Sequence, residues 1–179
     1  MMRVLWQELT FGLHDPQQLA RVLIRLVAAT LMGGLVGFQR ESTRKPAGLR
    51  THVLVCLGTA ALVVAGLSNG LSVEGISRVI QGVVTGIGFI GAGSILKLSQ
   101  EHAIKGLTTA ASVWMTAAIG VAIGLGSLGI ALILCVLALI ILSFARLEHS
   151  IEKNAQHHYH FDPGKKQKDG APVADADED

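Results

Sequence analysis

Long uncharged stretches threaded with glycine constrain this chain more than any other feature of its sequence. Eighteen residues separate Arg78 from Lys97 without a charged side chain, and forty separate Lys105 from Arg146. In water each glycine would weaken a helix by roughly 1 kcal/mol relative to alanine, whereas in a bilayer small residues let helix backbones approach closely. A transmembrane helix needs about twenty apolar residues, so these stretches predict a polytopic membrane protein.

The composition supports the same class. Half of the 179 residues are hydrophobic, only 16% are charged, and the mean hydropathy is +0.51, which a buried soluble core cannot account for. Cys56 and Cys135 both lie inside apolar segments, where cysteine behaves as a small hydrophobic residue, and we expect no disulfide between them. The first residues lack the pattern of a removable signal peptide, so the first crossing is expected to anchor the chain.

Five apolar segments predict an all-α membrane helix bundle with about five transmembrane helices. An odd number of crossings puts the termini on opposite sides of the membrane. The link after the first segment and the tail after the fifth are basic, so the positive-inside rule predicts a periplasmic N-terminus and a cytoplasmic C-terminus. Arg21 and Arg25 oppose this orientation, because they lie near the outer end of the first segment. The five segments span residues 19–38, 51–67, 76–96, 107–124 and 128–145.

The composition also divides the chain into three parts. A short N-terminal segment covers residues 1–18, and the transmembrane domain covers residues 19–147. From residue 148 to residue 179 the chain is rich in His, Lys and Asp with almost no large apolar residue. Such a segment cannot bury enough surface to offset its ordering entropy, so we expect a disordered cytoplasmic tail.

The chain aligns weakly with itself at an offset of 58 residues. Residues 48–67 and 106–125 share eight identities in twenty positions. Because the offset spans two crossings, both copies would have the same orientation, which predicts a parallel repeat of helical hairpins with the fifth helix unpaired. The alternative interpretation is that any two helices rich in glycine and alanine align this well.

The first basic link and the segments around residues 81–114 hold the candidate functional residues. In the link, a glycine and a proline predict a structured elbow, and Arg50 would need a partner such as Glu41 because it borders an apolar span. Gln81 and Thr85 share one helix face and are expected to bond across the bundle, whereas hydroxyls at the start of the fourth segment bond back to their own helix or to a ligand. The candidates are Arg40, Glu41, Gly48, Arg50, Thr51, Gln81, Thr85, Gly88, Gly91, Gly93, Gly106, Thr108, Thr109 and Trp114.

Enzymatic and cofactor-dependent functions find no support in these residues. Histidine, cysteine and carboxylate side chains nowhere have catalytic or zinc-binding spacing, the phosphate-binding lysine motif is missing, and the apolar spans contain no aspartate or glutamate. We therefore predict no catalytic residue, no metal ligand and no bound cofactor. Nothing in the sequence points to nucleic acid.

Three motifs resemble those of the MgtC/SapB family of bacterial inner-membrane proteins. They are AGLRT at residues 47–51, QGVVTGIGFIGAGSI at residues 81–95 and GLTTAASVWMTAAIG at residues 106–120, and the resemblance covers roughly residues 19–145. It implies a protein of about five helices that is associated with growth or survival in low Mg²⁺ and, in pathogens, with virulence. It also implies action on other membrane proteins, including the F-type ATP synthase, and not action as a pump.

Two departures from the family pattern bear on function. Family members commonly carry glutamate where this chain has Gln39, before Arg40, although Glu41 provides a carboxylate two positions later. Longer members also append a soluble regulatory domain, for which this tail is too short. The chain therefore resembles a short SapB-like member, and interactions that the missing domain mediates are not expected.

Two functional hypotheses remain open at this stage. The leading one is a non-enzymatic inner-membrane protein that supports Mg²⁺ homeostasis or low-Mg²⁺ adaptation by modulating other membrane proteins, with the bilayer and a membrane-protein partner or a second copy around it. The alternative is a small transporter or channel for Mg²⁺ or another cation, with a path along the glycine-rich third and fourth segments. Valine at Thr85 or Thr109 separates them, because a path would lose flux while a packing surface would lose association.

Overall fold

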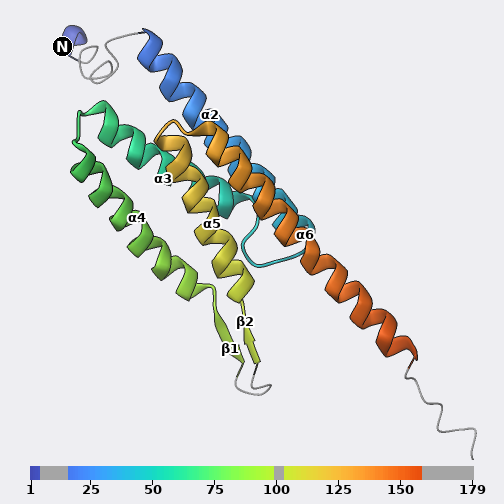
Figure 1. Ribbon diagram of the computed structural model, residues 1–179. Helices are drawn as coiled ribbons and strands as arrows, with labels where there is room; N and C mark the ends of the chain where they lie inside the picture. The colour runs from blue at the N-terminus through green and yellow to red at the C-terminus, as the bar shows by residue number, and fades with distance from the viewer. Residues whose placement is uncertain (5–15, 99–102, 159–179) are drawn as a thin grey trace, which may run out of the picture. The chain divides into compact units, whose positions relative to one another are not determined.

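The structure, a computed structural model, describes residues 1–4, 16–98 and 103–158. Its contacts divide the chain into one unit from Met1 to Ser143 and a second from Phe144 to Asp179, so the arrangement below concerns the first unit alone. The elements in Figure 1 are α2 (Pro16–Ser42), α3 (Leu49–Ser68), α4 (Val73–Gly93), β1 (Leu96–Leu98), β2 (Ala103–Lys105), α5 (Leu107–Gly124) and α6 (Leu128–His158).

The predicted membrane helix bundle is confirmed, with one difference in the fifth helix. Within the described residues, α2, α3, α4 and α5 are each long and apolar enough to cross a membrane. The apolar part of α6 is shorter, because it covers only Leu128–Phe144. At 1.5 Å per residue this is about 25 Å, slightly less than a hydrocarbon core of about 30 Å. Four helices therefore meet the length of a full span, and the fifth comes close to it.

The central helix of the first unit is α3, because α2 and α5 both approach it through glycine. A Cβ added to Gly33 of α2 would lie 2.7 Å from Cβ of Cys56, and one added to Gly124 of α5 would lie 2.7 Å from Cβ of Val63. Any larger side chain there would push the backbones apart. The contacts come in pairs spaced four residues apart, the spacing that close helix crossings in membranes use. The pairs are Gly33 with Gly37 and Gly120 with Gly124.

Around these contacts, buried apolar side chains from four helices form the main core. Ile119 and Ile123 of α5 are its largest fully buried members. The two cysteines are free, as predicted, and both are buried. The core residues are Ala29 and Val36 of α2, Cys56 and Ala60 of α3, Ile119, Ala122 and Ile123 of α5, and Ala131, Cys135 and Leu142 of α6.

A short β-hairpin connects α4 to α5, where the sequence predicted only a basic link. β1 and β2 pair in antiparallel register, with Leu96 opposite Lys105 and Leu98 opposite Ala103. The hairpin passes into α5 through Gly106, whose φ of +102° lies in the left-handed region. A Cβ at this position would collide with the carbonyl oxygen of Ser94, so the turn accommodates glycine and no residue with a side chain.

The helix boundaries agree with the internal repeat. Gly48 precedes α3 and Gly106 precedes α5, and these two glycines are the positions that the offset of 58 residues aligns. The same offset aligns the sequence of α2 with most of α4 and with β1. The two hairpins that the offset aligns, α2–α3 and α4–α5, differ in their connection, which is an elbow in the first and the β-hairpin in the second.

The expected disordered tail begins inside a helix. α6 continues to His158, beyond the predicted boundary at residue 148, because the polar residues that follow the membrane segment are compatible with helical backbone. The remainder of the predicted tail, residues 159–179, lies outside the described residues, as do most of the residues of the predicted N-terminal segment 1–18.

Candidate functional site

Two of the candidate residues, Arg40 and Thr109, meet in the interior at one end of the bundle. Arg40 lies in the last turn of α2 and Thr109 in the first turn of α5, and Nη2 of Arg40 donates to Oγ1 of Thr109 over 2.7 Å. Each residue is only 3% exposed. Nε of Arg40 is buried and has no hydrogen-bond partner among the described residues. Burial of a charge with one neutral partner is costly, so a guanidinium with these surroundings is unusual in a protein interior.

His52 of α3 extends this polar cluster, although none of the sequence motifs marked it. The residue is fully buried, with Nδ1 2.9 Å from the carbonyl oxygen of Gly48 and Nε2 3.3 Å from Oγ of Ser112. Because a carbonyl oxygen only accepts, Nδ1 carries the proton of the first bond. The Ser112 hydroxyl also lies 2.8 Å from the carbonyl oxygen of Thr109, so its single proton has two acceptors when the imidazole is neutral.

The expected pair between Glu41 and Arg50 does not form. Instead, Oε2 of Glu41 accepts the backbone N–H of Leu49 over 2.9 Å and so satisfies the first turn of α3. Arg50 is exposed, because the α3 helix turns its side chain away from the elbow. A Cβ at Gly48 would lie 3.1 Å from Oε2 of Glu41, so this glycine makes room for the carboxylate. Thr51 is half-buried beside this elbow.

A second arginine of α2 binds α5 at the opposite end of the bundle. Nη1 of Arg25 donates to the carbonyl oxygen of Gly124 over 2.9 Å, at the C-terminus of α5, where a cation is favoured by the helix dipole. The adjacent Gly126 has φ of +86°, and a Cβ there would lie 2.5 Å from Nη2 of Arg25. Arg25 and Arg40 are fifteen residues apart, and so are Thr109 and Gly124, so the two bonds join antiparallel helices at matched spacing.

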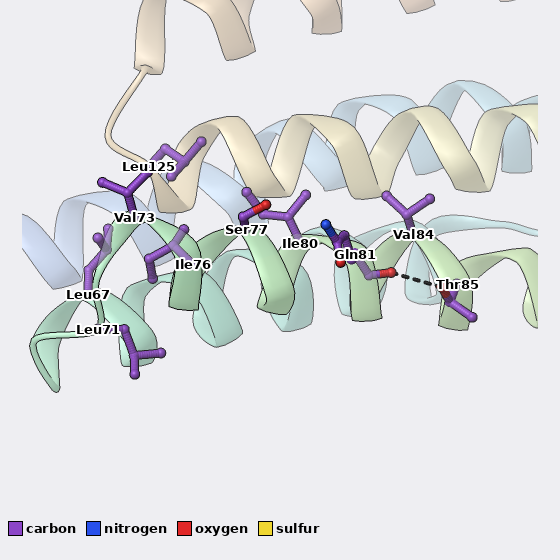
Figure 2. A pocket seen from close by; sticks show the side chains of 10 residues that line it. All are labelled: Leu67, Leu71, Val73, Ile76, Ser77, Ile80, Gln81, Val84, Thr85 and Leu125. Atoms are coloured by element: carbon purple, nitrogen blue, oxygen red, sulfur yellow. Dashed lines mark hydrogen bonds between the residues drawn. The ribbon is translucent and has the colours of Figure 1, made fainter.

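The other expected polar pair, Gln81 and Thr85, lies on the outside of α4. Figure 2 shows both side chains on the wall of a groove of about 740 Å³ that is otherwise mainly apolar. Oγ1 of Thr85 donates back to the carbonyl oxygen of Gln81 over 2.9 Å, so the predicted bond across the bundle does not form. The groove is lined by Leu67, Leu71, Val73, Ile76, Ser77, Ile80, Gln81, Val84, Thr85 and Leu125.

Most glycines of α4 face no other residue among those that the structure describes. A Cβ added at Gly88 or Gly93 would have no atom within 4 Å, and the same is true of Gly82 and Gly86. Gly91 alone among the α4 glycines faces α5, where a Cβ would meet Cβ of Ala110 at 3.7 Å. The glycines that first suggested close packing are therefore mainly on an open face.

The remaining candidates lie on α5. Thr108 is exposed, next to the buried Thr109. Trp114 is 48% exposed and lines a small groove of about 140 Å³ between α4 and α5. The structure thus brings Arg40, Thr109 and Gly48 into one cluster through His52, and it leaves the α4 candidates apart from them.

The polar groups of this cluster can be compared with those of a metal site. No group of three or more His, Cys, Asp or Glu side chains is placed there to hold a metal ion. The buried polar groups are instead a guanidinium, an imidazole and hydroxyls, which bind anions or form hydrogen bonds.

Comparison with known proteins places these features in context. The family model described as "MgtC family" matches residues 26–151. The chain is 43% identical over 130 residues to "Putative magnesium transporter YhiD" of Escherichia coli, a match that covers 69% of this chain and 60% of the relative. It is 41% identical over 136 residues to "Protein SrpB" of Synechococcus elongatus, covering 69% of this chain and 75% of the relative.

Further similarity is found to "Protein MgtC" of Brucella abortus, at 45% identity over 109 residues, which cover 60% of this chain and 44% of the relative. The match therefore spans 60% of the length of the Escherichia coli relative and 44% of the length of the Brucella abortus relative. No solved structure matches it.

Proposed function

Because the chain belongs to the MgtC family, we propose that it is a non-enzymatic bacterial inner-membrane protein that supports Mg²⁺ homeostasis by contact with other membrane proteins. The names of its relatives, "Protein MgtC" and "Putative magnesium transporter YhiD", support the connection with Mg²⁺. The action through contact rests on one structural observation, the open glycine face of α4.

No contact among the described residues explains why this face carries glycine instead of larger side chains. Gly82, Gly86 and Gly93 are spaced four and seven residues apart and so lie on one side of the helix. A Cβ added at any of them would have no atom of another described residue within 4 Å. Phe89 lies among them and is 84% exposed. Contact with lipid does not require glycine, whereas a close crossing with a helix of another protein does. The face therefore suits a transmembrane helix of a partner.

A cation transporter is the second candidate function, which the name of the Escherichia coli relative favours. Two features weigh against it. Gln81 and Thr85 line one groove and Thr108 lines another, so the expected path residues do not share a cavity. The buried guanidinium of Arg40 beside Thr109 also places a positive charge where a cation would have to pass.

The experiment that tests the proposal combines growth with transport. A bacterial host that lacks its own family member is complemented for growth in low Mg²⁺ with the wild type, with Gly86→Leu, or with Gly129→Leu as the matched control. Gly129 of α6 is an equally open glycine on a different helix. We expect Gly86→Leu to abolish complementation at unchanged membrane level, while Gly129→Leu complements fully.

In parallel, purified wild type and Thr85→Val are placed in sealed proteoliposomes for Mg²⁺ flux. Contact-based action predicts the same flux as in empty vesicles. Flux above that background, with a decrease in Thr85→Val, would refute the proposal and establish the transporter. Full complementation by Gly86→Leu would refute the assignment of the α4 face.

A further inference from the structure

The guanidinium of Arg40 is a buried positive charge for which the described residues provide no counter-charge. It is 3% exposed, its Nη2 donates to the neutral hydroxyl of Thr109, and its Nε has no partner in the described part of the chain. An uncompensated charge in a low-dielectric environment is costly, and proteins that keep one usually pair it with an anion.

The surrounding charges do not supply that anion. Glu41 follows directly in the sequence, but its carboxylate is exposed and accepts the N–H of Leu49. α5 begins at the same end of the bundle with no side-chain cap, so its positive dipole end is unneutralised. The other side chains of the elbow add positive charge and are exposed, namely Arg44, Lys45 and Arg50.

By its length, α2 would place this end of the bundle at the level of the lipid headgroups. α2 has 27 residues, which is about 40 Å at 1.5 Å per residue, whereas the hydrocarbon core is about 30 Å thick. The last turn of α2, which carries Arg40, therefore reaches the headgroup region of one leaflet. Phosphate groups of lipids are the anions present at that depth.

An apolar groove runs from the cluster toward the membrane interior. It has a volume of about 130 Å³ and lies between α2, α5 and α6. Val36 lies one helical turn before Arg40, and Thr108 and Ser112 lie one residue before and three residues after Thr109, so the groove is close to the Arg40–Thr109 bond. Nε2 of Gln39 donates to the carbonyl oxygen of Leu142, one of the lining residues, over 3.0 Å. The lining residues are Val36, Thr108, Ala111, Ser112, Met115, Ala138, Ile141 and Leu142.

We propose that this end of the bundle binds a phosphate oxyanion, and that a phospholipid supplies it, with the phosphate on Arg40 and part of an acyl chain in the groove. A guanidinium binds phosphate through parallel N–H donors, and the exposed hydroxyl of Thr108 offers a further donor at the groove entrance. The guanidinium has to turn toward the groove to meet the phosphate, because its Nε is enclosed. The site differs from the open face of α4 and does not depend on the function proposed for that face.

The test measures thermal unfolding of the purified full-length protein in a neutral detergent. Three probes are added separately: phosphatidylglycerol, the diacylglycerol with the same chains but no phosphate, and inorganic phosphate. The variants are Arg40→Gln, Ala111→Leu, which fills the groove, and Arg44→Gln, which removes an exposed charge near the same elbow. We expect phosphatidylglycerol to raise the Tm of the wild type and of Arg44→Gln, and diacylglycerol to leave it unchanged.

Arg40→Gln is expected to bind phosphatidylglycerol about tenfold more weakly, as for loss of one charge-assisted hydrogen bond. Ala111→Leu is expected to lose the response to the lipid. A wild-type response by Arg40→Gln, or an equal effect of diacylglycerol, would overturn the proposal. A response to inorganic phosphate that Ala111→Leu retains, without a response to lipid, would overturn the lipid as the source. If Arg40→Gln does not fold, Arg40→Lys replaces it, because lysine keeps the charge and loses the parallel donors.

Discussion

Replacement of Gly37 by alanine tests the close approach of α2 to α3, on which the whole bundle depends. The new Cβ would lie 2.7 Å from Cα and 2.9 Å from the carbonyl oxygen of Leu49. Both are backbone atoms, so no side chain can rotate away. Carbon atoms in contact are ordinarily about 3.5 Å apart or more, so the two helices would have to separate by about 0.8 Å at this point.

The energetic cost follows from two opposing effects. Overpacking of a close contact costs up to about 3 kcal/mol, whereas alanine in place of glycine favours a helix by about 1 kcal/mol. The net expectation for Gly37→Ala is a loss of about 2 kcal/mol. At roughly 2 to 4 °C per kcal/mol for a protein of this size, the Tm should fall by about 4 to 8 °C. Gly58→Ala is the matched control, because a Cβ at Gly58 meets nothing within 4 Å.

The assay is thermal unfolding of both purified variants in one detergent at one protein concentration, followed by circular dichroism. Gly58→Ala should unfold at or slightly above the wild-type Tm, since the helix gains propensity without a clash. An unchanged or raised Tm for Gly37→Ala would show that α2 and α3 are not held at the described separation, and the argument for glycine-mediated packing would fail with it.

Two hydrogen bonds that arginine side chains donate give further predictions, and the Tm measured in the same assay tests both. Arg25→Met should destabilise the protein by about 2 kcal/mol, because the last carbonyl of α5 loses a charged donor, whereas Arg21→Met on the exposed side should change stability by less than about 0.5 kcal/mol. Thr109→Val should cost about 1.5 to 3 kcal/mol, because Arg40 keeps its burial and loses its acceptor. The exposed neighbour provides the control, and an equal loss in Thr108→Val would contradict the role of the Arg40 bond.

Much of the fold could be predicted because it depends on local properties of the chain. Uncharged stretches of about twenty residues identify membrane helices whatever their neighbours are, and the segments predicted from residues 51 and 107 begin within two residues of α3 and α5. The β-hairpin was missed because each strand is only three residues long, and only the pairing of Leu96–Leu98 with Ala103–Lys105 makes them strands.

The candidate site was harder to predict, because it depends on which helices become neighbours. Glycine spacing indicated close packing, but it could not show that Gly33 and Gly120 contact α3 while Gly86 contacts nothing. His52 is buried by Gly37 of α2 and bonded to Ser112, sixty residues away, and neither relation is visible in sequence. One signal was present, since an ionisable residue inside an apolar span is itself unusual in a membrane.

The two arginine bonds from α2 to α5 also limit how the molecule can move. Arg25 holds one end of α5 and Arg40 holds the other, about 22 Å apart along the helix. A slide of α5 by one turn, or a rotation about its own axis, would break both bonds at once. α3 lies between these two helices, so the two bonds connect α2 and α5 around it. A movement of α4 or α6 alone would leave both bonds intact.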